Sequence, residues 1–185
     1  HDMSECVDQV HLDINNGPVG RPAKGWGAGP GPSFGLRMFK LTRVPQGMMA
    51  CGHGGTSMAQ WDPDLKKLGS KSLYGALLRR FNRNGAGVAG VLWYQGEGDA
   101  APEPAAVYTR CMKHLVASMR RDLHRKDLPV VMAQIGRVVN APPDATPPWN
   151  SIQEQQRKLP EVIARCAVVP TVDLTLDDFI HIGGE

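Results

Sequence analysis

The residues best suited to chemistry in this sequence are a carboxylate and an imidazole near its carboxyl end. Asp178 and His181 are spaced as D-x-x-H. On a loop or in a first helical turn, side chains three residues apart share a face, so the carboxylate can accept the Nδ1–H of the imidazole. The Nε2 atom of His181 is then free to act as a general base. The spacing is common by chance, so its weight depends on what lies near it in the fold.

Two other segments hold groups that can stabilise a developing negative charge. Gly54 and Gly55 follow a short apolar run, and consecutive glycines let backbone N–H groups approach a ligand closely. Gln95 follows a second apolar run and carries a neutral amide that can donate a hydrogen bond to an oxyanion. A tight turn and a solvated loop are the simpler interpretations of these segments when each is taken alone.

Glu97 offers a second carboxylate two residues beyond Gln95. A carboxylate in this position can also orient a histidine. The sequence therefore leaves two partners open for His181, namely Asp178 and Glu97. Among the other histidines, only His53, in the glycine-rich segment, competes with His181 as a base.

The elements that must position these groups alternate between short apolar runs and amphipathic stretches. Continuous apolar runs of this length are typical of strands buried on both faces of a sheet. Apolar residues that recur every four positions, such as Leu73, Leu77 and Phe81, are typical of a helix packed on such a sheet. The predicted strands span residues 47–51, 88–94, 129–135 and 167–172, and the predicted helices span residues 33–41 with Ser33 as N-cap, 70–83, 107–123 with Pro104 near the start, and 150–159.

This alternation predicts an α/β fold, a three-layer sandwich with a mostly parallel sheet. In such sheets, ligands bind beyond the carboxyl ends of the strands. The paired glycines follow the first predicted strand, the Gln-Gly-Glu segment follows the second, and the D-x-x-H segment follows the fourth. We therefore expect all three segments to meet at one rim of the sheet.

Composition limits the class of protein. The chain of 185 residues has 42% hydrophobic and 21% charged residues, which fits one globular domain spanning residues 1–185. Its net charge is +3 and its basic residues are spread out, which argues against a nucleic-acid-binding surface. No apolar run reaches the roughly 18 residues of a membrane span. The 4 cysteines include no C-x-x-C pair, which argues against a zinc site.

Three blocks of the sequence carry a resemblance to a known family. They are Gly-Gly-Thr-Ser-Met-Ala-Gln-Trp-Asp-Pro at residues 54–63, Leu-Trp-Tyr-Gln-Gly-Glu-Gly-Asp-Ala at residues 92–100, and Asp-Phe-Ile-His at residues 178–181. With them, the chain resembles the sialate O-acetylesterase-like group of SGNH hydrolases, which includes carbohydrate esterase family 6. The Gly-Pro-Gly-Pro-Ser-Phe segment at residues 29–34 is also similar, and the resemblance runs from about residue 27 to residue 181.

The resemblance implies a serine esterase that hydrolyses O-acetyl groups. Its substrate would be an acetylated carbohydrate, with no metal and no organic cofactor, and a periplasmic or secreted location would fit the family. The roles that it implies are general base for His181, carboxylate partner for Asp178 or Glu97, and oxyanion donors for Gly54, Gly55 and Gln95.

One block that the resemblance leads us to expect is absent. In this family the nucleophilic serine lies near the N-terminus in a Gly-Gln-Ser-Asn block that follows the first strand. This sequence contains no such block. We therefore expect the nucleophile not to be in this chain, and the chain to be truncated at both ends.

Two alternatives remain open at the level of sequence. A non-catalytic glycan-binding protein with an SGNH fold would need no nucleophile. An α/β-hydrolase could use Ser33, because residues 31–35 match the G-x-S-x-G pattern. That pattern requires a hydrophobic strand before the serine, whereas glycine and proline precede Ser33 here.

Overall fold

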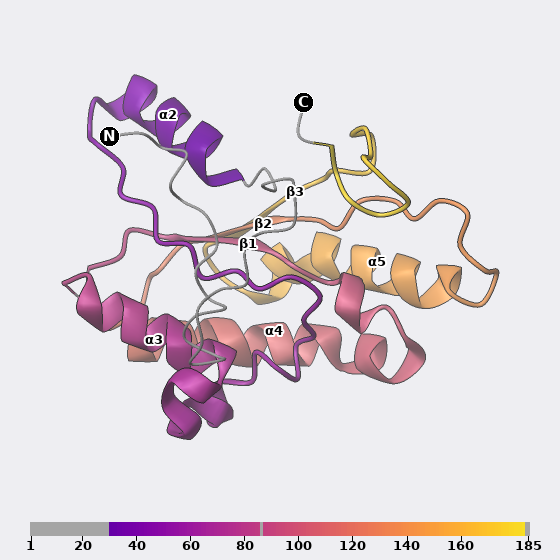
Figure 1. The fold of residues 1–185 in the computed structure, drawn as a ribbon, viewed down its shortest axis with the longest axis horizontal. Coiled ribbons are helices and arrows are strands. Elements are labelled where there is room, and N and C mark those ends of the chain that lie inside the picture. The colour runs from indigo at the N-terminus through magenta and orange to yellow at the C-terminus, as the bar shows by residue number, and fades with distance from the viewer. Residues whose placement is uncertain (1–29, 86, 184–185) are drawn as a thin grey trace, which may run out of the picture.

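Three parallel strands form a sheet with the other described elements arranged around it (Figure 1). The computed structural model describes residues 30–85 and 87–183. Within this part of the chain the sheet has the order β1-β2-β3, so each strand pairs with the next one in sequence. The described elements are α2 (Pro30–Thr42), η2 (Pro63–Lys71), α3 (Leu73–Arg83), β1 (Val91–Tyr94), η3 (Glu97–Asp99), α4 (Pro102–Asp122), β2 (Val130–Ala133), α5 (Thr146–Val162) and β3 (Cys166–Val169).

The parallel register brings the carboxyl ends of the strands to one rim of the sheet. Val130 pairs with Val91 on one side and with Cys166 on the other, where all three strands begin. Tyr94 pairs with Ala133 where β1 and β2 end. The segments that follow the strands therefore leave the sheet side by side, which is where parallel sheets bind ligands.

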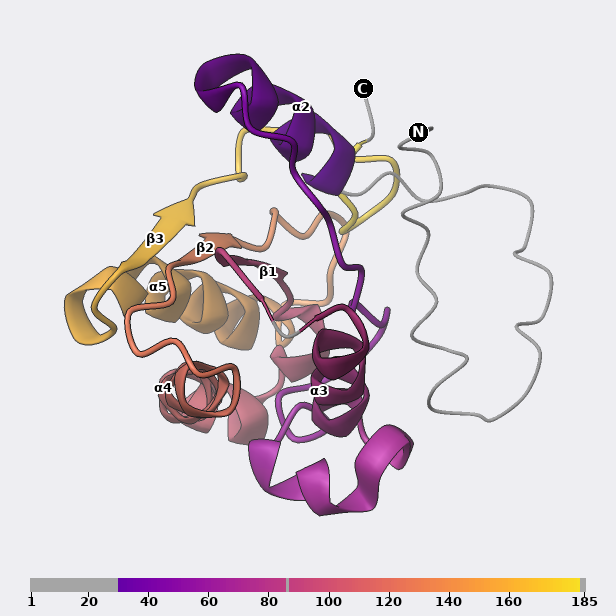
Figure 2. The ribbon, with the colours of Figure 1, turned by 90° about the vertical axis from the view of Figure 1, so that its left-hand side faces the viewer.

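Helices lie on both sides of the sheet. α4 and α5 cover one face, whereas α2 lies across the strands from them (Figure 2). In β2, Val130 and Met132 are buried, and the residues that alternate with them are only partly buried. Since successive strand residues face opposite sides, the fully buried core lies on one face of β2. This parallel sheet flanked by helices confirms the predicted α/β fold class.

The predicted helices form where their apolar stripes meet the core. In α3, Leu73, Leu77 and Phe81 are all buried. Ser72 precedes the helix as its N-cap, and its side-chain oxygen accepts the backbone N–H of Gly75 at 3.1 Å. α4 and α5 likewise include the ranges predicted for them, apart from the last residue of the α4 range, and each begins a few residues earlier than predicted.

Two predictions about local structure are wrong. Residues 47–51 form no strand, because no described strand runs beside them to pair with their backbone groups. Ser33 is not an N-cap, because α2 begins at Pro30 and places the serine inside the helix. Proline has a helical φ and lacks an N–H that the first turn leaves unpaired, so Pro30 can begin the helix ahead of Ser33.

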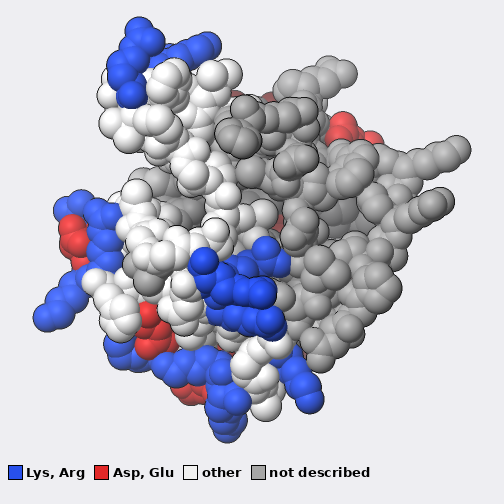
Figure 3. All heavy atoms as spheres, turned by 60° about the vertical axis from the view of Figure 1, so that its left-hand side comes forward, with Lys and Arg blue, Asp and Glu red and all other residues white. Residues whose placement is uncertain are grey.

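The surface carries charges of both signs. On the face in Figure 3, lysine and arginine side chains lie over several elements, with acidic side chains between them and no single basic stripe. Within residues 30–85 and 87–183, no helix combines the length and the apolar character needed to cross a membrane.

Candidate active site

The D-x-x-H segment folds so that its carboxylate holds its histidine. Asp178 Oδ2 lies 2.6 Å from His181 Nδ1. The other carboxylate oxygen, Oδ1, accepts the backbone N–H groups of Ile180 and His181, both at 2.8 Å. The bond to His181 and then these two backbone bonds lower the pKa of Asp178 to about 2. Asp178 is therefore ionised at neutral pH and keeps the proton of His181 on Nδ1, which leaves Nε2 able to accept one.

The loop that carries this pair is closed on itself and attached to the rim of the sheet. Leu176 and Ile182 form an antiparallel bridge across its base. The backbone N–H of Val139, in the segment after β2, donates to the carbonyl of Phe179 at 3.0 Å. A Cβ atom at Gly136 would lie 3.5 Å from the side chain of Ile182, so the loop packs directly on this segment. His181 is thereby placed at the carboxyl rim.

Side chains from two helices hold the turn after β1 in place. The backbone carbonyl of Gln95 accepts hydrogen bonds from Tyr108 Oη at 3.0 Å and from Gln156 Nε2 at 2.9 Å. These side chains come from α4 and α5. Any side chain at Gly96 would place its Cβ 2.7 Å from Gln156 Nε2, so only glycine fits this turn without displacing α5.

The paired glycines dock onto this same turn. Gly55 has a φ of +66°, which lets the chain reverse ahead of Thr56. The carbonyl of Thr56 accepts a hydrogen bond from Gln95 Nε2 at 2.9 Å. Neither backbone N–H of Gly54 and Gly55 donates to another group within the described part of the chain. The structure therefore brings the glycine turn and Gln95 together, with two backbone donors left for a ligand.

The amide of Gln95 is more occupied than the sequence suggested. Its Nε2 donates both to the Thr56 carbonyl at 2.9 Å and to Asp99 Oδ2 at 2.6 Å. Its Oε1 is buried and has no hydrogen-bond partner among the described residues. An oxyanion that used Gln95 would have to share or displace one of the two N–H bonds.

Glu97 contacts a tyrosine rather than His181. Burial raises the pKa of Tyr94, and the charge of Glu97 and a hydrogen bond to it raise it further. The charge of Asp178 raises the same pKa by a smaller amount, so Asp178 also lies within electrostatic reach of the phenol. Tyr94, Glu97 and Asp178 thus share one rim. Sequence reasoning missed Tyr94, although it stands immediately before Gln95 in the W-Y-Q-G-E-x-D block.

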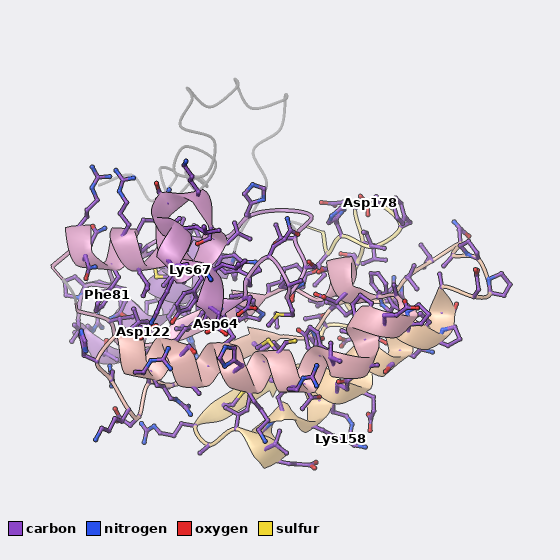
Figure 4. The ribbon with its side chains drawn as sticks, turned by 90° about the horizontal axis from the view of Figure 1, so that it is seen from below. Asp64, Lys67, Phe81, Asp122, Lys158 and Asp178 are labelled. Carbon is purple, nitrogen blue, oxygen red and sulfur yellow. The ribbon has the colours of Figure 1, made fainter. Side chains whose placement is uncertain are left out.

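One group among the described residues has the donor set of a metal site. The carboxylates of Asp62 and Asp64 and the imidazole of His114 have ligand atoms within 4.8 Å of one another. Asp62 is already used as the N-cap of η2, where it accepts the backbone N–H of Asp64 at 2.9 Å. Figure 4 places Asp64 well apart from Asp178, so this group is not part of the rim.

A shallow basin on the surface also lies away from the candidate site. It is lined by residues at the end of α4 and just beyond, namely Ala117, Arg120, Arg121, His124 and Lys126. This segment leads into the start of β2, so the basin lies toward the opposite rim of the sheet from His181.

The position of Ser33 argues against the α/β-hydrolase alternative. In that fold the nucleophile sits on a sharp turn between a strand and a helix. Ser33 instead lies inside α2, in the helix that begins at Pro30. The match of residues 31–35 to G-x-S-x-G is therefore a coincidence of composition.

The described fold is a parallel α/β sheet with a histidine–carboxylate pair, a glycine turn and an amide at its rim. Comparison with known proteins identifies the family. The model of the family described as "Carbohydrate esterase, sialic acid-specific acetylesterase" matches residues 3–185. The chain belongs to this family and to its sialate O-acetylesterase-like SGNH group.

Individual relatives agree with this assignment. The chain is 28% identical over 138 residues to a probable carbohydrate esterase of Arabidopsis thaliana, At4g34215, covering 71% of this chain and 48% of the relative. The crystal structure of that Arabidopsis protein matches with a TM-score of 0.73 at 25% identity, over 88% of this chain and 64% of the other. The chain thus spans about half the length of the curated relative that it matches.

A bacterial structure shares the fold. It is described as a novel carbohydrate acetylesterase, XAC1771, from Xanthomonas citri, and it matches with a TM-score of 0.70 at 23% identity. The match covers 82% of this chain and 36% of that protein.

Proposed function

We propose that this chain supplies the general base and the oxyanion donors of a serine esterase that removes O-acetyl groups from carbohydrate. The observation that carries the proposal is the 2.6 Å contact between Asp178 Oδ2 and His181 Nδ1, on the same rim as the glycine turn and Gln95. The family and the names of the relatives support a carbohydrate substrate. For this chain, we further propose that the carbohydrate carries an O-acetyl group and that this group is the one removed.

The first half of the proposed reaction transfers the acetyl group to a serine. The serine Oγ attacks the acetyl carbonyl carbon while His181 Nε2 takes its proton, and Asp178 stabilises the imidazolium that forms. The backbone N–H groups of Gly54 or Gly55, with the amide of Gln95, stabilise the oxyanion. His181 then returns the proton to the departing sugar oxygen, and the C–O bond to the sugar breaks.

The second half releases acetate. His181 Nε2 takes a proton from water, whose oxygen attacks the acetyl-serine carbonyl through the same oxyanion donors. The acyl–serine bond breaks, the serine oxygen regains the proton from His181, and acetate leaves. We assign the nucleophile to a serine outside these 185 residues, because the sequence holds no Gly-Gln-Ser-Asn block and Ser33 lies inside a helix.

We assign the carboxylate of the triad to Asp178 rather than Glu97. Asp178 contacts the imidazole, and its second oxygen is held by two backbone N–H groups, so its position does not depend on the substrate. Glu97 is engaged by Tyr94 instead. In this proposal Glu97 keeps Tyr94 in place at the edge of the site.

A glycan-binding protein without catalysis is the competing function, and the absence of a nucleophile block in the sequence favours it. The test is acetate release from p-nitrophenyl acetate and from acetylated xylan and sialate by the full gene product. Replacing the base, His181→Ala, should lower kcat by roughly 10³- to 10⁶-fold. The matched control is His114→Ala, an exposed histidine that also faces carboxylates, and its kcat should equal that of the wild type.

The result distinguishes the two functions. Saturable binding of the sugars with no acetate release would support glycan binding and exclude the esterase. Wild-type turnover in the His181→Ala protein would remove His181 from the mechanism.

A further inference from the structure

Asp99 is a buried carboxylate to which neither the sequence motifs nor the proposed mechanism assigns a role. It is 2% exposed, and no ion pair joins it to a basic group in the described part of the chain. Burial raises its pKa, and hydrogen bonds from Gln95 and the backbone of Met58 offset part of that rise. Burying a charge without a cation is costly, so the hydrogen-bond donors around Asp99 must stabilise the carboxylate.

Those partners belong to the two halves of the oxyanion site. Both oxygens of Asp99 accept the backbone N–H of Met58, at 2.9 and 3.1 Å. Met58 lies in the segment that continues from the glycine turn. Oδ2 also accepts Gln95 Nε2 at 2.6 Å. Asp99 therefore joins two segments that are 41 residues apart in sequence.

The same carboxylate decides which way the Gln95 amide points. Gln95 Nε2 lies between two acceptors, Asp99 Oδ2 at 2.6 Å and the Thr56 carbonyl at 2.9 Å. Rotating the amide by half a turn would place Oε1 against both acceptors, where oxygen atoms repel each other. Only the orientation with Nε2 toward Asp99 satisfies both contacts.

The close fit of the two segments supports this role. A Cβ atom at Gly98 would lie 2.7 Å from the Thr56 carbonyl oxygen, so the turn around Asp99 is pressed against the glycine-turn segment. Trp61 Nε1 donates to the Thr56 hydroxyl at 3.0 Å and holds that segment from its other side. Small displacements of Asp99 would therefore move the glycine turn and the Gln95 amide relative to each other.

We propose that Asp99 is the positioning residue of the oxyanion site, fixing the Gln95 amide and the glycine turn in one geometry. This inference rests on the proposed esterase function, but its structural half does not need turnover. An asparagine whose oxygen takes the place of Oδ2 would keep the bonds from both Met58 and Gln95, because Oδ2 accepts both of them. Asp99→Ala has no side-chain acceptor and therefore releases the Gln95 amide from the Met58 segment.

The first arm of the test measures kinetics in the full gene product. Asp99→Ala should lower kcat by about 10²-fold while KM changes by less than about twofold, because displaced donors weaken transition-state binding more than substrate binding. The matched control is Asp122→Ala. Asp122 is also mostly buried, accepts hydrogen bonds from Tyr74 and Lys66, and lies at the end of α4. Its kcat should be unchanged. Asp99→Ala with near wild-type kcat would overturn the proposal.

The second arm needs no esterase activity and no variant that must fold. In ¹⁵N-labelled wild-type protein, the Gln95 side-chain amide and the Met58 backbone amide should titrate together, with one midpoint above the ordinary 3.8 of an aspartate. Tyr108 and Cys111 also lie near Asp99, and their raised pKa values keep them out of the acid range. Glu97→Gln removes the carboxyl two residues before Asp99 in sequence and should leave the midpoint in place.

The two arms separate the possible failures. If the wild type releases no acetate, the proposed function fails, and the shared titration alone decides whether Asp99 couples the two segments. If the two amides titrate separately or not at all, the positioning role is wrong whatever the kinetics show.

Discussion

Replacing Asp178 by asparagine tests the triad assignment most informatively. The substitution preserves the loop but reverses the direction of the hydrogen bond to His181 Nδ1. Asparagine Oδ1 can still accept the backbone N–H groups of Ile180 and His181, which now lie 2.8 Å from Asp178 Oδ1. In the native protein Asp178 Oδ2 accepts a hydrogen bond from His181 Nδ1 at 2.6 Å. In the variant an NH₂ group takes the place of Oδ2, so it donates a hydrogen bond to Nδ1 instead. The imidazole must then carry its proton on Nε2, so it cannot accept one from a serine.

The expected loss is large but is moderated by solvent. The corresponding aspartate-to-asparagine change in chymotrypsin-type triads lowers kcat by about 10⁴-fold. His181 and Asp178 side chains are 63% and 42% exposed, so water can partly replace the lost orientation. We therefore expect Asp178→Asn to lower kcat for p-nitrophenyl acetate by about 10²- to 10⁴-fold, with thermal stability close to that of the wild type.

Glu97→Gln serves as the control, because it removes the other candidate carboxylate. It should lose no more than a few-fold in kcat, since Glu97 contacts Tyr94 and not His181. If Glu97→Gln abolished turnover while Asp178→Asn retained it, the assignment of the triad carboxylate would be reversed and the tautomer argument refuted.

Three further predictions test other parts of the site and fold. Gln95→Ala should lower kcat by roughly 10²- to 10³-fold if its amide serves as an oxyanion donor; an unchanged kcat would confine it to structure. Gly98→Ala should lower the melting temperature, because its Cβ would lie 2.7 Å from the backbone oxygen of Thr56, an overpacking that costs about 1–3 kcal/mol. Gly87→Ala, with no atom within 4 Å of its Cβ, should not lower it. Burial opposes ionisation of Asp122, but hydrogen bonds from its neighbours outweigh it and hold its pKa at about 2. Its stabilisation is present above its ordinary pKa of 3.8 and is lost as the pH falls toward 2. Asp122→Asn should flatten that part of a denaturation curve measured against pH.

The buried Asp99 carboxyl changes stability with pH in the opposite direction to Asp122. Its pKa is raised in the folded protein, so folding favours its protonated form and stability falls as the pH rises through the interval above 3.8. Asp99→Asn should remove this decline. Urea denaturation of the wild type and of Asp99→Asn at several pH values measures it, and equal slopes of the two curves across this interval would contradict it.

The main elements of the fold could be predicted because each has a local signal. The helices α3, α4 and α5 carry apolar stripes, and β1, β2 and β3 are continuous apolar runs. Residues 47–51 have the same apolar character, but a strand also needs a neighbour to pair with, and composition says nothing about that. The start of α2 was misplaced for a smaller reason, since Pro30 favoured an earlier first turn than Ser33.

The candidate site could be predicted as a set of segments but not as a set of contacts. The glycine turn and Gln95 lie together as predicted, although residues 47–51 ahead of the glycines form no strand. The choice between Asp178 and Glu97 required knowing which carboxylate reaches the imidazole. The role inferred for Asp99 depends on a contact across 41 residues and on burial, neither of which leaves a periodic signal in the sequence.

The central claim is that His181 activates a serine at the carboxyl rim, and active-site labelling measures this directly. The full gene product is treated with a fluorophosphonate, and the modified serine is located by peptide mass spectrometry, in the wild type and in His181→Ala. We predict one adduct on a serine outside these 185 residues, formed in the wild type and strongly slowed in the variant. An adduct on Ser33, or equal labelling with and without the imidazole, would contradict the account.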